Sequence, residues 1–316
     1  MEILLPNFWK VGTFQKHRQK KALNRALFFF LFLLAFSCSK PDETTFSERL
    51  QVDAYLFNAY QGQSEFYLEE EYGINYSEIT EVSTISIDRE TGAQVALHGA
   101  VFGEYSFGVQ DTVIVVFSGG YGHLDYYYSR IKLLKSMSPN FKVIFFDYQG
   151  IGRSEGQFSF GNMQLDAEAI LRWVKSRTQN CTVAFYVCGL GSIAFMPLNL
   201  ENDTSFWIQP KVILENPVAT SEFLVSGAVQ FNLPISYSGV PEIDLISVAS
   251  EQKGMFLMLL SELDERIDPK DHGQVLFEEL PQNKTLLQIE EAGHHTIPLV
   301  EGFSTYNSIL YDFLSN

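Results

Sequence analysis

The chain has 316 residues, 46% of them hydrophobic, which is enough for one large hydrophobic core or two small ones. Its formal net charge at pH 7 is −16. Because an acidic surface repels phosphate groups and anionic lipid headgroups, this charge argues against a nucleic-acid-binding function.

The first 37 residues have the layout of a secretory signal peptide and are set apart from the folded domain. Six basic residues precede an unbroken apolar run from Ala26 to Phe36. These eleven residues, at about 1.5 Å each, are too short to cross a hydrocarbon core of about 30 Å. Removing residues 1–37 would take away six basic residues and one acidic residue and leave a net charge near −21.

The apolar run ends in Leu34-Ala35-Phe36-Ser37-Cys38, which resembles the lipobox of bacterial lipoproteins. By this resemblance Cys38 is the lipidated first residue of the mature protein, and residues 38–48 are a polar tether. The protein is then expected in the bacterial cell envelope, lipid-anchored to the outer membrane on its periplasmic or surface face. The alternatives are a signal peptide cut at another bond and a membrane anchor that is never cleaved.

A single domain is expected to occupy residues 49–316. The run 46–72 is amphipathic and rich in glutamate and aromatic residues, which favours one or two helices at the edge of the fold. Two alternating β-branched runs, 81–87 and 94–102, then flank a turn that contains Gly92. This pattern predicts an antiparallel hairpin.

Beyond the hairpin, short apolar runs alternate with helical stretches such as 161–175. Runs of this length and composition fit strands that are buried on both faces of a parallel sheet. Strands that alternate with helices indicate βαβ units with right-handed crossovers. We therefore predict an α/β fold, a mostly parallel doubly wound sheet with an N-terminal antiparallel hairpin. The expected parallel strands are 112–117, 142–146, 182–187, 211–214, 255–260 and 285–289.

Two glycine-rich segments carry a family resemblance. Residues 115–122 read VVFSGGYG and residues 147–156 read DYQGIGRSEG. They resemble the oxyanion loop and the D-x-x-G-x-G-x-S-x-G turn of the α/β-hydrolase superfamily, in its serine-aminopeptidase and monoacylglycerol-lipase-like branch. The resemblance extends over residues 80–316 and implies the α/β-hydrolase fold. It also implies that Ser154 is structural, and that the oxyanion-binding residues are Gly120, Tyr121 and Leu190.

Residues 185–194, FYVCGLGSIA, resemble the nucleophile elbow of this family, in which a serine occupies the sharp turn between a strand and a helix. The preferred alignment places Gly189 at the position of the nucleophile, and the other register places Gly191 there. Glycine offers no attacking atom in either register. Two neighbours are weaker candidates: Ser192, about one helical turn further along, and Cys188, whose side chain is expected to point away from the histidine.

Two later strand ends supply the acid and the base that the resemblance implies. Residues 259–269, LLSELDERIDP, imply Asp264 as the acid, with Asp268 as runner-up. The sequence EAGHH at residues 291–295 implies His294 as the base. Because both follow expected strands in the family's order, we expect Asp264 and His294 to lie close together. The remaining histidines of the domain are expected to be structural or solvated: His98, His123, His272 and His295.

The resemblance thus predicts a membrane-anchored α/β-hydrolase-family protein that is non-catalytic or weakly catalytic and binds a small molecule, lipid or peptide. The alternative is an active hydrolase of esters, lipids or peptides that uses Ser192 or Cys188 with His294 and Asp264. Residues 219–252 are expected to form either a short cap over the site or an ordinary crossover helix with its loop.

No cofactor and no metal are expected. Cys181 and Cys188 lie at opposite ends of an expected strand, about 23 Å apart, whereas a disulfide needs Cα atoms within about 7 Å. Neither cysteine has a companion at the spacing of zinc ligands. The sequence makes no prediction of oligomeric state.

Overall fold

The computed structural model describes residues 51–68, 72–120, 122–198, 210–222 and 243–316. These residues lie in the larger of two compact units, Ser47–Asn316. The predicted lipidation residue Cys38, the predicted oxyanion residue Tyr121 and most of the predicted cap, 223–242, fall outside them. A search of the described helices finds none with the length and hydropathy needed to cross a membrane.

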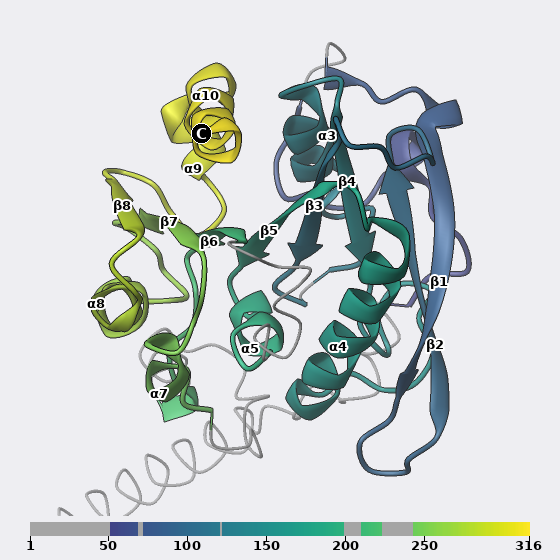
Figure 1. Cartoon of the computed structure of the whole chain (residues 1–316), viewed down its shortest axis with the longest axis horizontal. Coiled ribbons are helices and arrows are strands. Elements are labelled where there is room, and N and C mark those ends of the chain that lie inside the picture. Colours follow the sequence, from purple (N-terminus) through teal and green to yellow (C-terminus); the bar gives the residue numbers. More distant parts are fainter. Residues whose placement is uncertain (1–50, 69–71, 121, 199–209, 223–242) are drawn as a thin grey trace, which may run out of the picture. The chain divides into compact units, whose positions relative to one another are not determined.

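Eight strands form one sheet in the order β1-β2-β4-β3-β5-β6-β7-β8 (Figure 1). The hairpin of β1 and β2 is antiparallel, β2 is also antiparallel to β4, and the other neighbours are parallel. The fold class and the hairpin are therefore as the sequence predicts. The strands are β1 (Ile79–Ile87), β2 (Gln94–Phe102), β3 (Thr112–Phe117), β4 (Phe141–Phe146), β5 (Thr182–Cys188), β6 (Lys211–Glu215), β7 (Met255–Ser261) and β8 (Lys284–Ile289).

Helices cover both faces of the sheet (Figure 1). One face carries α4 (Phe160–Arg177), α5 (Gly191–Phe195), α7 (Ile246–Ala249) and α8 (Val275–Glu279), which follows a π-helical turn η5 (Lys270–Gln274). The other face carries α3 (Tyr128–Ser136), α9 (Ile297–Glu301) and α10 (Phe303–Ser315).

Because side chains alternate along a strand, each central strand contributes to both hydrophobic cores. In β3, Val113 and Val115 belong to the core under α4 and α5, while Ile114 and Val116 belong to the core under α3 and α10. Burial on both faces explains why these strands are continuous apolar runs in the sequence.

The helices expected in the run 46–72 are not found in its described part, and that prediction is wrong there. Residues 51–68 contain only a short 3₁₀ turn, η1 (Phe57–Ala59); a second such turn, η3 (Tyr76–Glu78), lies just before β1. The buried aromatic residues Tyr55 and Phe57 are two positions apart, as are Phe66 and Leu68, which suits an extended chain rather than a helix. We call residues 51–68 the N-terminal strap.

Two buried carboxyl groups, those of Asp125 and Asp147, hold the strap against the domain. Asp125 accepts hydrogen bonds from the backbone N–H groups of Leu56 and Phe57, the latter at 2.6 Å. Asp147, at the end of β4, accepts one from the Tyr55 hydroxyl at 2.5 Å. These bonds satisfy backbone groups that a helix would have paired internally, which explains how the strap can be non-helical and still buried.

The carboxyl of Asp147 is buried and only partly hydrogen-bonded. Its second oxygen, Oδ1, is buried without a hydrogen-bond partner among the described residues. Burial raises the pKa of Asp147 to about 8, and the nearby charge of Asp125 adds to this, while the Tyr55 hydrogen bond opposes it. The neutral carboxyl is therefore the form that the fold prefers at pH 7.

Replacing Asp147 with asparagine is expected to remove a pH dependence of stability. A carboxyl whose pKa is raised on folding stabilises the fold fully below its unfolded pKa of about 4 and loses this contribution as the pH rises towards 8. The loss amounts to at most about 1.4 kcal/mol per pH unit. Urea unfolding at pH 5 and pH 8 should show Asp147→Asn gaining stability relative to the unchanged chain as the pH rises. Parallel pH profiles would contradict the assignment.

Candidate active site

The ends of β3, β5, β6, β7 and β8 meet at one edge of the sheet. Each is followed by a short loop that carries a residue of interest: Gly119 and Gly120 after β3, Gly189 after β5, Asn216 after β6, Asp264 after β7 and His294 after β8. Open α/β sheets bind their ligands at the carboxyl ends of parallel strands. The topology therefore brings the predicted acid, base and elbow together.

The turn between β5 and α5 distinguishes the two elbow registers. Gly189 has a φ of +52°, and a Cβ built on it would lie 3.9 Å from His294 Cε1, with no described heavy atom closer than 3.8 Å. A Cβ on Gly191 would instead lie 2.1 Å from the carbonyl oxygen of Phe117. Gly189 is thus the apex that faces the histidine, while Gly191 lets α5 pack closely against β3.

Asp264 and His294 form a buried pair. His294 Nδ1 lies 2.7 Å from Asp264 Oδ2, and the other carboxylate oxygen accepts hydrogen bonds from the backbone N–H groups of Arg266 and Ile267, both at 2.8 Å. With Nδ1 donating to the carboxylate, Nε2 is left as an acceptor. The runner-up, Asp268, accepts from the backbone N–H of Lys270 instead.

Asn216, which no motif in the sequence singles out, holds the loop of His294 in place. Its side-chain amide donates to the backbone oxygen of His294 at 3.0 Å and to Ser261 Oγ at 2.8 Å. The residue has a φ of +45°, a conformation that asparagine adopts more readily than most residues. The signal that could have indicated this role was an asparagine two residues after the expected strand 211–214.

Ser192 does not contact the acid–base pair. Its hydroxyl donates to the carbonyl oxygens of Gly189, at 2.9 Å, and Val218, at 3.1 Å, and accepts from the Val218 N–H at 3.0 Å. The residue is fully buried. These bonds tie the start of α5 to the segment after β6, so the geometry gives Ser192 a structural role.

Cys188 is equally unsuited to attack. Its Sγ is directed to the carbonyl oxygen of Phe117, at 3.7 Å. Burial raises the pKa of the Cys188 thiol above its usual value, and Arg130 opposes this only in part. Since the thiolate is the reactive form, the environment keeps this cysteine unreactive.

Gly119, Gly120 and Leu190 lie where backbone amides could stabilise a developing negative charge. Gly120 has a φ of +72°. A Cβ built on Gly119 would lie 3.8 Å from the backbone nitrogen of Leu190, which places the loop after β3 beside the first turn of α5. Two of the segments that the resemblance assigns to oxyanion binding, the turn after β3 and the first turn of α5, are therefore neighbours in the structure.

Below the site, on the α3 and α10 side, lies a buried charged cluster that the sequence analysis did not identify. Arg130 donates to Glu65 of the strap, from Nη2 at 2.6 Å and from Nε at 2.8 Å, and Nη1 pairs with Glu215 at 2.8 Å. All three side chains are at most 2% exposed. The hydroxyls of Tyr186 and Tyr306 donate to Glu215 and complete what we call the Arg130 cluster.

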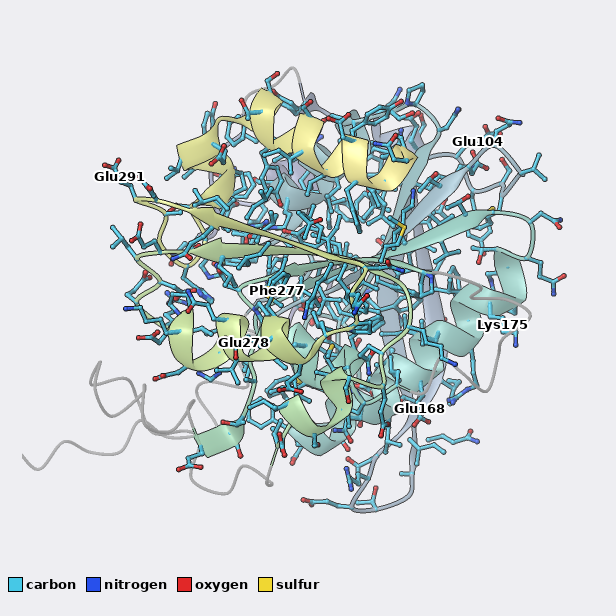
Figure 2. The ribbon with its side chains drawn as sticks, turned by 60° about the vertical axis from the view of Figure 1, so that its left-hand side comes forward. Glu104, Glu168, Lys175, Phe277, Glu278 and Glu291 are labelled. Atoms are coloured by element: carbon cyan, nitrogen blue, oxygen red, sulfur yellow. The ribbon has the colours of Figure 1, made fainter. Side chains whose placement is uncertain are left out.

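His295 links this cluster to the acid–base pair. Its Nδ1 lies 3.2 Å from Glu65 Oε1, and its ring contacts that of His294 with centroids 4.2 Å apart. Burial lowers the pKa of His295 more than the Glu65 carboxylate raises it. The neutral imidazole is therefore favoured. Glu291, on the same loop, is exposed and projects outward (Figure 2).

The other predicted site residues can be placed as follows. Ser154 Oγ donates to the carbonyl oxygen of Asp147 at 2.7 Å and accepts from the His98 N–H at 2.9 Å, which ties the turn to β2. His272 Nδ1 accepts from the backbone N–H of Ala219 at 3.0 Å. Within the described ranges, no three His, Cys, Asp or Glu side chains converge in a way that could hold a metal ion.

No protein-family model and no curated protein matches the chain by sequence. Solved structures do match it. An esterase of Pyrococcus furiosus superimposes with a TM-score of 0.58 at 16% identity, over 79% of this chain and 94% of its own. An alpha/beta hydrolase from Penicillium gives a TM-score of 0.56 at 13% identity, over 75% and 98%. A bromoperoxidase of Bacillus anthracis gives 0.51 at 12% identity, over 74% and 100%. The chain therefore has the α/β-hydrolase fold, as the sequence predicts.

Proposed function

We propose that this protein is a membrane-anchored α/β-hydrolase-fold protein that binds a small-molecule, lipid or peptide ligand and does not form an acyl-enzyme. One observation carries the proposal. The apex that faces His294 is Gly189, which has no side chain to attack a carbonyl, although the Asp264–His294 pair is in place at 2.7 Å. Removing triad members costs serine hydrolases roughly 10⁴- to 10⁶-fold in rate, so acyl transfer through an enzyme-bound intermediate would be lost.

The contacts of the two neighbouring candidates support this proposal. The Ser192 hydroxyl is occupied by Gly189 and Val218, and the Cys188 thiol is directed to Phe117. To serve as nucleophile, either side chain would have to break these contacts and turn towards His294. We therefore favour loss of the nucleophile over its replacement by a neighbour.

Labelling with a fluorophosphonate tests the proposal, because this reagent reacts with serines that a histidine activates. The purified chain should remain unlabelled under conditions that label a serine esterase completely. Intact-mass measurement gives the stoichiometry, and peptide mapping locates any adduct. Stoichiometric modification of Ser192 would contradict the proposal.

The membrane anchor is proposed from the sequence around Cys38. The supporting features are a basic flank, an apolar run of eleven residues that ends at Phe36, and a cysteine two residues further on, after Ser37. Expressed in a bacterium with radioactive palmitate, the full chain should incorporate the label and sediment with membranes. Cys38→Ala should lose both properties, and a Cys181→Ala control should keep both. A label that persists in Cys38→Ala would contradict lipidation at this residue.

A further inference from the structure

A small cavity lies beside the apex of the elbow. It is lined by residues from four strand ends, from the strap and from the residue before α3, among them Gly119, Tyr127, Gly189, Leu190, His294 and His295. The space open to the centre of a water-sized sphere is about 10 Å³. A polar cavity of about 10–15 Å³ by this measure is the smallest that holds one water molecule. We call it the apex cavity.

His294 lines this cavity with one ring nitrogen free of any described partner. Its Nδ1 is engaged by Asp264 at 2.7 Å, and no other described side chain hydrogen-bonds to its ring. Nε2 is therefore an available acceptor on a residue that lines the cavity. The Cβ position of Gly189, 3.9 Å from His294 Cε1, marks the side of the ring where a serine would stand.

The cavity also offers further polar groups to a water molecule. Tyr127 lines it, and burial raises the pKa of the Tyr127 hydroxyl well above its usual value, so that this group keeps its proton and can donate. His295 lines it too, and its Nε2 is buried without a hydrogen-bond partner among the described residues. With His294 this gives three residues that line the cavity and carry a donor or an acceptor, and a buried water needs two to four partners.

We infer that the apex cavity positions a water molecule as the nucleophile and that His294 acts on it as general base, so that acyl esters are cleaved without an acyl-enzyme. The inference rests on the proposed loss of the elbow nucleophile. The water takes the place that the hydroxyl of an elbow serine would occupy, one hydrogen bond from Nε2. The reaction needs one water molecule and His294, which acts first as base and then as acid, with Asp264 as its partner.

The proposed step balances as follows. The water oxygen forms a bond to the acyl carbon while its proton passes to His294 Nε2, and the carbonyl electron pair moves to the oxygen. Asp264 stabilises the imidazolium that results. The C–O bond to the leaving group then breaks, and His294 returns the proton to the departing oxygen. The products are a carboxylic acid and an alcohol, and the Asp264–His294 pair is restored.

The loop after β3 and the start of α5 would receive the negative charge on the oxygen. The amide of Leu190 lies beside Gly119, and both residues line the apex cavity. His294 lines the same cavity, so an oxyanion held by these amides would form close to the water that attacks. General base catalysis contributes typically 10²- to 10⁴-fold, far less than a complete triad. A slow hydrolase is therefore expected.

Hydrolysis of p-nitrophenyl acetate by the full chain tests the inference. The unchanged protein should turn over repeatedly, without a burst and without an acetyl adduct in intact-mass spectra. His294→Gln should lower the rate at least about 100-fold, while His98→Gln, on the partly exposed strand β2, should leave it unchanged. Equal rates for the unchanged chain and His294→Gln would overturn the inference.

Gly189→Ala probes the water itself. Its methyl group has room in the cavity, with the nearest described atoms 3.8–3.9 Å away, and it leaves the Asp264–His294 pair intact. Hydrolysis should fall to the level of His294→Gln; full activity would refute the water site. The two proposals fail separately. An acetyl adduct on Ser192 or Cys188 would contradict the proposed function, whereas an unmodified protein without His294-dependent turnover would contradict only the water mechanism.

Discussion

Gly189→Ser is expected to give this protein a covalent esterase activity that it otherwise lacks. The new Cβ would have ordinary contacts, with Ile267 Cδ1 at 3.8 Å and His294 Cε1 at 3.9 Å, and its hydroxyl would come within reach of Nε2. Because triad residues act as a unit, the gain in hydrolysis of p-nitrophenyl acetate should be at least about 100-fold. A burst of p-nitrophenol and complete fluorophosphonate labelling at residue 189 should accompany it.

Gly189→Ala is the matched control for this substitution. It introduces the same Cβ at a φ of +52° and therefore the same backbone strain, without the hydroxyl. It should have the same thermal stability as Gly189→Ser and remain unlabelled. Adding His294→Gln to Gly189→Ser should abolish labelling. A folded Gly189→Ser that reacts no faster than Gly189→Ala would show that the loop after β3 or the pocket no longer supports acyl transfer.

Arg130→Met is expected to lower the free energy of unfolding by about 3–5 kcal/mol, because it leaves the Glu65 and Glu215 carboxylates buried without their counter-charge. In the unchanged protein, burial raises the pKa of Glu65. Arg130 and the hydrogen bond from His295 together lower this pKa by more than burial raises it, so that it lies at about 2. Without the Arg130 guanidinium, the Glu65 carboxylate would stay buried with His295 as its weaker partner. Urea unfolding at pH 7 gives the difference directly.

Arg172→Met is the control for this prediction. Arg172 pairs with Glu168 on the outer surface of α4, where both side chains are more than half exposed, and Figure 2 shows Glu168 projecting outward. Such surface pairs contribute about 0–1 kcal/mol, so this variant should stay close to the unchanged protein. Arg130→Lys keeps the charge but loses the planar fork and should fall between the two. Equal effects of Arg130→Met and Arg172→Met would contradict a structural role for the cluster.

The Arg130 cluster is also expected to make stability depend on pH. Glu65 has a depressed pKa in the folded state, so its contribution to stability is present above its unfolded pKa of about 4.3 and is lost as the pH falls towards 2. Asp147 behaves in the opposite sense, because its raised pKa of about 8 favours the fold at low pH. The strap is thus held by two carboxyls with opposite responses to pH.

The parallel strands and the hairpin could be predicted because their signal is local. The strands β2 and β3 coincide with the expected ranges, and the other expected strands differ from the observed ones by at most two residues at an end. An apolar run of five or six residues is sufficient evidence for a strand buried on both faces. The fixed order of strand and helix then determines the order of the loops that carry Gly189, Asp264 and His294.

The strap and the Arg130 cluster could not be predicted in this way. The amphipathic composition of residues 46–72 favours helix, yet residues 51–68 are mostly irregular, because Asp125 and Asp147 bind the strap backbone and Tyr55 from distant segments. Nothing in the neighbourhood of Glu65 along the chain indicates that its partner is Arg130. The conformation of the strap and the charge of Glu65 each depend on partners more than fifty residues away along the chain.

Local patterns along the chain are enough to predict the fold class, the order of the motifs and the absence of a nucleophilic side chain at the expected apex. Three features depend on the packing of distant segments: Gly189 rather than Gly191 faces His294, Ser192 and Cys188 are held in other bonds, and an arginine and two glutamates share one buried site. The difference arises because the pattern of apolar residues is a local property of the chain. The direction of a side chain and the pairing of a buried charge depend on which surfaces water leaves when distant segments pack together.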